Sequence, residues 1–197
     1  MIKKQDFIID KVKRASHNGH ISCVVWLFGL SGSGKSAIAN SLEKKLFELG
    51  NHTYVLDGDN TRLGLNKDLG FTAVERLENV RRAAEVANLM AEAGLIVICS
   101  FITPYEEQRE LVKQILRNQH SLQVFVDCSI ETCEKRDPKG LYEKARSGEI
   151  KNFTGISDSF ERPSDPDIIV NTENFSLNEC VLLVAEGILR LSTQNKI

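Results

Sequence analysis

The spacing of hydrophobic and polar residues alternates between two patterns along most of the chain. Short, continuous apolar runs, of which 23–28 is the clearest, are typical of strands buried on both faces of a parallel sheet. Between these runs, apolar residues recur every three or four positions, as on one face of a helix. Strands are predicted at 23–28, 52–56, 95–101, 122–128 and 168–170, and helices at 35–49, 74–93, 106–118, 130–135 and 177–191. The alternation predicts an α/β fold of three layers, with a parallel β-sheet flanked by helices.

Two segments depart from this alternation. Residues 1–20 are polar and are expected to form an N-terminal helix or arm. Residues 137–165 are rich in Gly, Asp and Pro and carry several basic side chains. This segment is either a solvated charged loop or a mobile basic lid that closes over phosphates. No repeat or linker divides the chain, so we expect a single domain over residues 1–197 with a lid region at 137–165.

Composition narrows the classes of function. The 197 residues include 27 acidic and 25 basic ones, for a net charge of −2, which argues against a nucleic-acid partner. Five cysteines, without a C-x-x-C pair, indicate reduced thiols in a cytoplasmic protein. The N-terminus has no signal-type apolar core, and the longest apolar run, 23–30, is too short to span a membrane. The four histidines lack metal-ligand spacing.

A phosphate-binding motif follows the first predicted strand. Residues 29–36, GLSGSGKS, fit G-x-x-x-x-G-K-[ST] and open the first long helix. In this motif backbone N–H groups and the helix N-terminus face phosphates, Lys35 can reach the β- and γ-phosphates, and the Ser36 hydroxyl can coordinate Mg²⁺. ATP and Mg²⁺ are therefore the predicted cofactors, with Ser36 as the metal ligand. The predicted nucleotide-binding residues here are Gly29, Ser31, Gly32, Ser33, Gly34, Lys35, Ser36 and Ala37.

Two carboxylates directly follow the second predicted strand. Because the carboxyl ends of parallel strands meet at one edge of the sheet, Asp57 and Asp59 are expected beside the phosphate loop. One of them could accept the proton of an acceptor hydroxyl or hold Mg²⁺ through water. The alternative is a simple turn, since Asp-Gly-Asp-Asn is favourable turn chemistry.

A cationic group follows the carboxylates. Arg62 comes three residues after Asp59, and Arg76 and Asn79 lie one turn apart on a predicted helix. Arginine suits bidentate recognition of phosphate or sulfate oxygens, and Phe71 could stack on a base. The alternative is that these are surface arginines paired with neighbouring glutamates.

Together, these motifs resemble those of a known family. The chain is similar to the adenylyl-sulfate (APS) kinases, which phosphorylate the ribose 3′-hydroxyl of adenosine 5′-phosphosulfate to give PAPS and ADP in sulfate assimilation. The resemblance runs from Asn18 to the last strand. Its matching stretches are 29–36, 57–62, 64–71 (GLNKDLGF), 78–82 (ENVRR), 101–105 (FITPY), 136–142 (RDPKGLY) and 144–155 (KARSGEIKNFTG). It implies the P-loop kinase fold and a homodimer.

The resemblance also implies roles for individual residues. Asp59 would be the catalytic carboxylate, Arg136 would lie near the ATP base, and residues 137–155 would form the closing lid. Lys35 of the phosphate-loop motif is the second predicted catalytic residue. The residues expected to bind the acceptor are Arg62, Phe71, Arg76, Asn79, Ile102, Thr103, Lys139 and Phe153, with Ile102 and Phe153 sandwiching its adenine.

Five positions depart from the family pattern. Leu63 stands where His or an aromatic residue is usual, Thr103 replaces Ser, and Ala37 replaces Thr. In residues 160–163, Phe160 replaces Tyr and Arg162 replaces Ala. Two alternatives to an APS kinase therefore remain open. One is a kinase of another nucleotide-linked acceptor, such as a cytidine diphosphate derivative. The other is a non-catalytic nucleotide-binding switch, although intact Lys35, Ser36 and Asp59 argue against it.

Overall fold

The computed structural model describes residues 3, 5 and 7–193, and its described strands form one parallel sheet. The strands are β1 (Cys23–Phe28), β2 (Thr53–Asp57), β3 (Ile96–Ser100), β4 (Ser121–Asp127) and β5 (Ile168–Asn171). Their order across the sheet is β2-β3-β1-β4-β5, and every neighbouring pair is parallel. Residues 1, 2, 4 and 6 of the predicted N-terminal arm lie outside the described residues.

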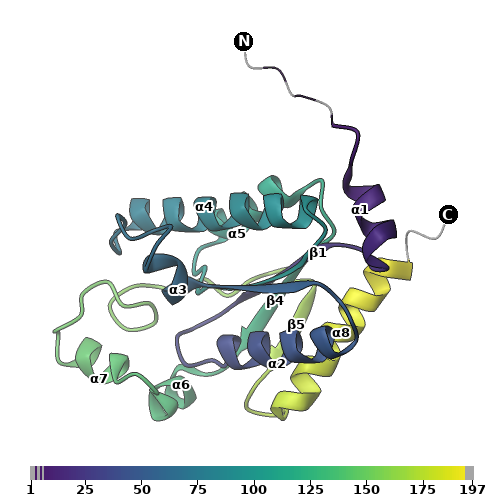
Figure 1. Cartoon of the computed structure of the whole chain (residues 1–197). Helices are drawn as coiled ribbons and strands as arrows, with labels where there is room; N and C mark the ends of the chain where they lie inside the picture. The colour runs from purple at the N-terminus through teal and green to yellow at the C-terminus, as the bar shows by residue number, and fades with distance from the viewer. Residues whose placement is uncertain (1–2, 4, 6, 194–197) are drawn as a thin grey trace.

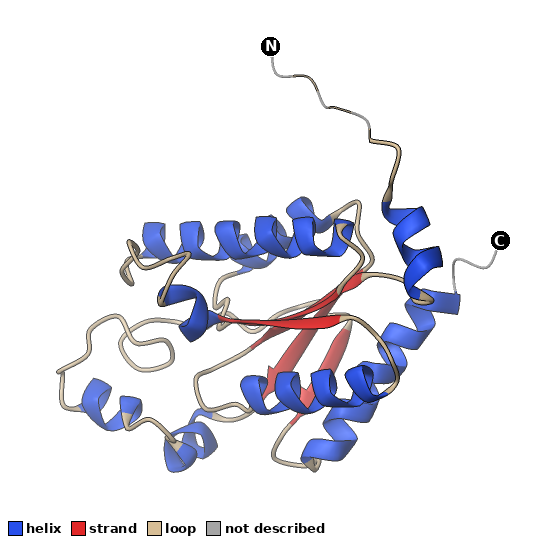
Figure 2. Cartoon of the chain, viewed as in Figure 1, coloured by secondary structure: helices blue, strands red, loops and turns tan. Residues whose placement is uncertain are grey.

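Helices cover both faces of this sheet (Figures 1 and 2). The helices are α1 (Lys11–Asn18), α2 (Lys35–Glu48), α3 (Gly58–Arg62), α4 (Ala73–Glu92), α5 (Glu106–Leu116), α6 (Ile130–Arg136), α7 (Leu141–Arg146) and α8 (Leu177–Thr193). In Figure 1, α4 and α5 lie above the sheet and α2 and α8 below it. The three-layer α/β fold predicted from the sequence is confirmed.

The central strand shows why the first apolar run is continuous. Every residue of β1 is buried, and successive side chains enter cores on opposite faces. Val25 and Leu27 pack with α2 and α8, whereas Val24, Trp26 and Phe28 pack with α4 and α5. Both cores meet on β1, so the loop that leaves its carboxyl end starts from the most deeply buried strand.

The segment after β2 is a helix and not the turn that was weighed for residues 57–60. Asp57 caps α3, because its Oδ1 accepts hydrogen bonds from the backbone N–H groups of Asp59 at 3.0 Å and Asn60 at 3.4 Å. The same residue types favour turns and helix N-caps, which explains the ambiguity. The cap holds Asp59 at the first turn of α3.

The lid region contains secondary structure that the sequence pattern did not predict. Residues 141–146, LYEKAR, form α7 and bury Tyr142 and Ala145 against Cys133 and Phe153. A helix of only six residues is too short to show the apolar period clearly. The segment is therefore more than a solvated loop, because it contributes a small core of its own.

The described helices have no membrane-spanning candidate. None of them combines the length and the apolar content that crossing a bilayer requires.

Candidate active site

The phosphate loop depends on glycines that no other residue could replace without strain. Gly29, Gly32 and Gly34 have φ angles of 151°, 75° and 104°, in the region that favours glycine. A Cβ on Gly29 would lie 2.5 Å from the carbonyl oxygen of Val126, and one on Gly32 would lie 3.0 Å from that of Cys133. The loop therefore sits tightly on β4 and α6 and presents its backbone to the cavity above it.

Lys35 lies within this loop rather than in solvent. The residue is 8% exposed, and its Nζ donates a hydrogen bond to the carbonyl oxygen of Leu30 at 2.7 Å. Burial lowers the pKa of Lys35 to about 8, against the opposing attraction of the nearby Asp57 and Asp59 carboxylates. A poorly solvated cation at this position is suited to bind the negative charge of phosphates.

Ser36 and Asp57 connect the phosphate loop to β2. The Ser36 hydroxyl donates to Oδ2 of Asp57 at 2.9 Å, and the other oxygen of this carboxylate caps α3. A hydroxyl beside a carboxylate is a donor set that suits Mg²⁺, which binds through one or two protein oxygens and keeps several waters. No cluster of three or more acidic, His or Cys ligands occurs among the described residues.

Asp59 projects into the cavity and contacts the lid. Its side chain is 70% exposed and forms an ion pair with Nζ of Lys139. This contact raises the pKa of Lys139. The structure therefore places both predicted residues together, Asp59 from α3 and Lys139 from the start of the lid region.

Two arginines and an aromatic ring line the side of the cavity where the sequence predicts the acceptor. The Arg62 guanidinium lies 4.3 Å from the centroid of the Phe71 ring, and that of Arg76 lies 5.7 Å from it. Arg62 donates to the carbonyl oxygens of Leu69 and Gly70, at 2.9 and 3.0 Å. Burial and the proximity of Arg76 lower the pKa of Arg62.

Neither arginine is paired with the glutamates beside it. Glu75 completes the capping box of α4 with Thr72, and Glu78 binds Arg81 and Arg82. The structure thus contradicts the alternative in which Arg62 and Arg76 are ordinary surface ion pairs.

The lid region contacts Arg76. The Arg76 guanidinium donates to the Thr154 hydroxyl at 3.0 Å and to the carbonyl oxygen of Asn152. At the phosphate loop, the Tyr142 hydroxyl donates to the carbonyl oxygen of Ser31 at 2.9 Å. The Tyr142 and Phe153 rings also pack edge to face. The lid region therefore contacts both halves of the site.

The loop after β3 holds Thr103 in an unusual conformation. Its φ angle is 42°, which is rare for a β-branched residue and concentrates at functional sites. Trp26 donates from Nε1 to the Thr103 hydroxyl at 2.9 Å, and the buried Arg109 donates to the carbonyl oxygens of Thr103 and Pro104. These contacts fix the position of Ile102, which lines the cavity.

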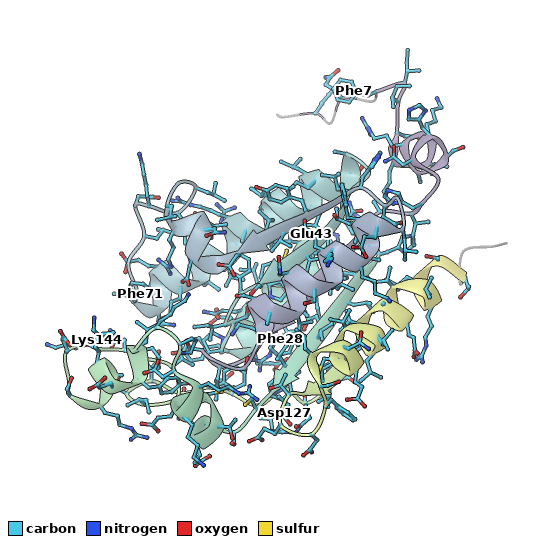
Figure 3. All side chains as sticks on the ribbon, turned by 60° about the horizontal axis from the view of Figure 1, so that its bottom comes forward. Phe7, Phe28, Glu43, Phe71, Asp127 and Lys144 are labelled. Atoms are coloured by element: carbon cyan, nitrogen blue, oxygen red, sulfur yellow. The ribbon has the colours of Figure 1, made fainter. Side chains whose placement is uncertain are left out.

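A cavity of about 710 Å³ joins these parts. Most of the predicted site residues line it: Ser31, Gly32, Gly34, Lys35, Ser36, Ala37, Asp59, Arg62, Phe71, Arg76, Asn79, Ile102, Thr103, Lys139 and Phe153. Figure 3 shows Phe71, from the loop before α4, and Lys144, from α7, at the same end of the molecule. Gly29 and Ser33 also belong to the phosphate loop, but they do not line the cavity.

Arg136 lies on the other side of the phosphate loop. Its guanidinium donates to the hydroxyl and the carbonyl oxygen of Thr172, at 3.0 and 2.8 Å. The Thr172 hydroxyl in turn donates to the carbonyl oxygen of Ser33. Arg136 therefore lies beside the phosphate loop but outside the main cavity. From there it could contact a part of the nucleotide that extends past the phosphates.

Two of the departures from the family pattern lie away from the cavity. Leu63 is 84% exposed. Arg162 forms a bidentate pair with Asp127 at 3.0 and 2.9 Å, which ties the end of the lid region to β4. Ala37 and Thr103 do line the cavity.

Sequence reasoning missed several residues of the site. Trp26, Asn66, Tyr142 and Thr154 hold site residues in place, although they come from separate elements. Their contacts span from 13 to 111 positions of the chain, so no local pattern shows them. Asn66, Tyr142 and Thr154 do lie in the stretches 64–71, 136–142 and 144–155 that resemble the family, and this was the one sequence signal that pointed to them.

Three features together define the class of P-loop kinases. They are a parallel sheet, a glycine-rich loop with Lys35 and Ser36 that opens α2, and carboxylates directly after the second strand. The family model of adenylylsulphate kinase matches residues 21–171. The adenylyl-sulfate kinase of Staphylococcus haemolyticus is 53% identical over 92% of this chain and 91% of its own length. That of Pseudomonas entomophila is also 53% identical, over 91% and 89%.

A solved structure agrees with these sequence relatives. The Mycobacterium tuberculosis APS kinase, in complex with AMPPNP and APS, superposes with a TM-score of 0.83 at 45% identity, covering 86% of this chain and 98% of that one. The chain belongs to the adenylyl-sulfate kinase family. It is accordingly an ATP-using kinase whose acceptor group is a hydroxyl.

Proposed function

We propose that this chain transfers the γ-phosphate of ATP to the ribose 3′-hydroxyl of adenosine 5′-phosphosulfate, giving PAPS and ADP. One observation carries the proposal: a single cavity joins the phosphate loop to Asp59 and to the cationic side formed by Arg62 and Arg76. A phosphate donor and an anionic nucleotide acceptor fit the two halves, with a carboxylate between them. Membership of the adenylyl-sulfate kinase family supports APS over a cytidine-linked acceptor.

The donor half would bind the triphosphate of ATP through the backbone of residues 29–34 and through Lys35. Phosphoryl transfer depends on positioning and on stabilising charge, and a buried lysine on a rigid loop provides both. Ser36 and Asp57 would hold Mg²⁺ beside these phosphates, where it neutralises part of their charge. Arg136 would lie toward the adenine of ATP.

The acceptor half would orient the hydroxyl. Asp59 is the proposed base, which takes the proton of the 3′-hydroxyl as its oxygen attacks the γ-phosphate. Lys139 forms an ion pair with one oxygen of this carboxylate, Oδ2, and the second oxygen could accept the proton of the hydroxyl. Arg62, Arg76 and Asn79 would bind the anionic linkage, and Phe71, Ile102 and Phe153 the adenine.

We further propose that residues 137–155 act as a lid within a single domain of 197 residues. The contacts of Tyr142 with the phosphate loop and of Arg76 with residues 152–154 would close it over both substrates. Hydrogen exchange of the 137–155 backbone should slow markedly when AMPPNP and APS are both present. Equal protection with and without both ligands would identify a static segment.

An ADP-release assay tests the function directly. The purified chain is supplied with ATP, Mg²⁺ and one of three acceptors: APS, a cytidine diphosphate derivative or a free sugar. We expect ADP release with APS alone, and a product that carries the new phosphate at the 3′ position by NMR. Faster turnover of the cytidine compound would overturn the choice of acceptor, and activity with none would favour a nucleotide-binding switch. The homodimer and the cytoplasmic location stay predictions, to be tested by sedimentation and cell fractionation.

A further inference from the structure

A buried pair of asparagine amides lies behind the acceptor half of the cavity. Asn66, in the loop between α3 and α4, is 0% exposed, and Asn79 on α4 is 7% exposed and lines the cavity. Nδ2 of Asn66 donates to Oδ1 of Asn79 at 3.0 Å and to the main-chain carbonyl oxygen of Asn79 at 3.5 Å. One amino group therefore joins Asn66 to Asn79 twice.

The main-chain carbonyl sets the direction of both amides. A carbonyl oxygen can only accept, so Asn66 must turn its amino group and not its oxygen toward Asn79. That amino group then needs an acceptor on the Asn79 side chain, which brings Oδ1 of Asn79 toward Asn66. The amide carries its donors on the opposite branch, so Nδ2 of Asn79 is directed away from Asn66, on a residue that lines the cavity.

Asn66 itself is incompletely satisfied in this arrangement. Its Oδ1 is buried and has no hydrogen-bond partner among the described residues. A buried oxygen without a partner is unfavourable, and an apolar side chain of similar size would avoid that penalty. Packing therefore does not explain an amide at position 66, whereas donation to Asn79 does.

We propose that Asn66 is a positioning residue that orients the Asn79 amide so that its NH₂ group meets the anionic linkage of the acceptor. The proposal rests on the proposed function, in which Asn79 binds APS beside Arg62 and Arg76. With the amide reversed, an oxygen would face the acceptor's negative charge and repel it. Asn66 thus determines whether Asn79 attracts or repels the substrate.

The variant Asn66→Asp tests this orientation. An ionised carboxylate at position 66 cannot donate, so Asn79 must turn its NH₂ group toward it and present oxygen to the cavity. We expect the Kd for APS, measured by calorimetry at pH 8, to rise about tenfold or more, the scale of a lost charge-assisted hydrogen bond. The Kd for AMPPNP should stay unchanged. The exposed Asn118→Asp is the matched control and should bind both ligands normally.

A pH series separates orientation from structural damage. As the pH falls, the introduced carboxyl becomes protonated and its O–H can again donate to Asn79, so APS affinity should recover toward that of the unmodified chain. General damage to the loop predicts no recovery and a parallel loss of AMPPNP binding. Either of those results would overturn the positioning role.

A double-mutant cycle shows whether Asn66 acts through Asn79. In the Asn79→Ala background, Asn66→Asp should cause no further loss of APS affinity, and losses that add would contradict the proposal. If Asn66→Asp does not fold, NMR of the unmodified chain tests the proposal instead. We expect the side-chain NH₂ signals of Asn79 to shift when APS binds. Unshifted signals would overturn the proposal. If the unmodified chain does not bind APS at all, the proposed function fails instead.

Discussion

The proposed donor and acceptor halves of this site are built in different ways. The phosphate loop is one continuous run, residues 29–36, whose binding surface is mostly backbone and whose shape depends on positive φ angles at glycines. The acceptor half is assembled from side chains on α3, α4, the loop after β3 and the lid. Its arginines are held by carbonyl oxygens, those of Leu69 and Gly70 for Arg62 and that of the distant Asn152 for Arg76.

This difference predicts how each half responds to change. A backbone surface tolerates most substitutions but depends absolutely on its few special residues, because no neighbour can take their place. A side-chain surface divides recognition among several groups, so each loss weakens one substrate by a limited amount. Substitutions should therefore cause large losses of turnover in the donor half and selective losses of affinity in the acceptor half.

The largest effect is expected at Lys35. Lys35→Ala removes the buried cation that follows the charge of the transferred phosphoryl group, and turnover should fall by roughly 10³–10⁵-fold. The fold should persist, because the cation is poorly solvated there and contributes little to stability. The control is Lys44→Ala, on the exposed face of the same helix. Steady-state rates and thermal melts check both, and turnover near that of the unmodified chain would refute a catalytic role for this loop.

At the boundary of the two halves, Asp59→Asn should reduce kcat by roughly 10²–10⁴-fold, the usual scale for loss of a general base. Both substrates should still bind within a few-fold, because the side-chain shape is preserved. Asp57→Asn is the informative rival, since Asp57 caps α3 and binds Ser36, and its loss should lower stability and Mg²⁺ dependence as well. If Asp57→Asn is inactive while Asp59→Asn loses only a few-fold, the base has been assigned to the wrong residue.

In the acceptor half, Arg76→Ala should weaken APS binding by about 2–3 kcal/mol, the loss typical of a charge-assisted pair. ATP affinity should hardly change, because Arg76 lies beside Phe71 and the lid rather than beside the phosphate loop. Arg81→Ala, on the same helix and bound to Glu78, is the matched control. Equal losses for both ligands in calorimetry would show that the two halves are not independent.

The two halves of the site also differ in how much of each could be predicted from the sequence. The positions of the strands rest on local apolar runs, and the phosphate loop is contiguous, so both were predictable, whereas the order of the strands across the sheet was not predicted. Of the acceptor half, the positions of Arg62 and Arg76 were predicted, but their partners were not. The pairing of Asn66 with Asn79 joins a loop to a helix across 13 positions, which no periodic pattern encodes. Arg136 was expected near ATP, yet its contact with Thr172 depends on how β5 lies beside β4.

The smallest expected effect is the pH dependence of ATP use, which should distinguish the donor half from the acceptor half. Lys35 must be protonated to attract phosphates, and burial lowers its pKa to about 8. As the pH rises through this value the free enzyme loses the cation, so kcat/KM for ATP should fall above about pH 8.

Bound nucleotide reverses this shift, because the negative charge of the phosphates favours the protonated amine. At saturating ATP, kcat/KM for APS should therefore begin to fall only at higher pH than kcat/KM for ATP. Calorimetry of AMPPNP in buffers of different ionisation enthalpy should show proton uptake on binding at pH 8–9, the window in which the free enzyme has lost part of this proton. Coincident profiles for the two substrates, or binding without proton uptake, would mean that Lys35 stays fully charged in the free enzyme. The donor half would then depend on pH no more than the acceptor half does.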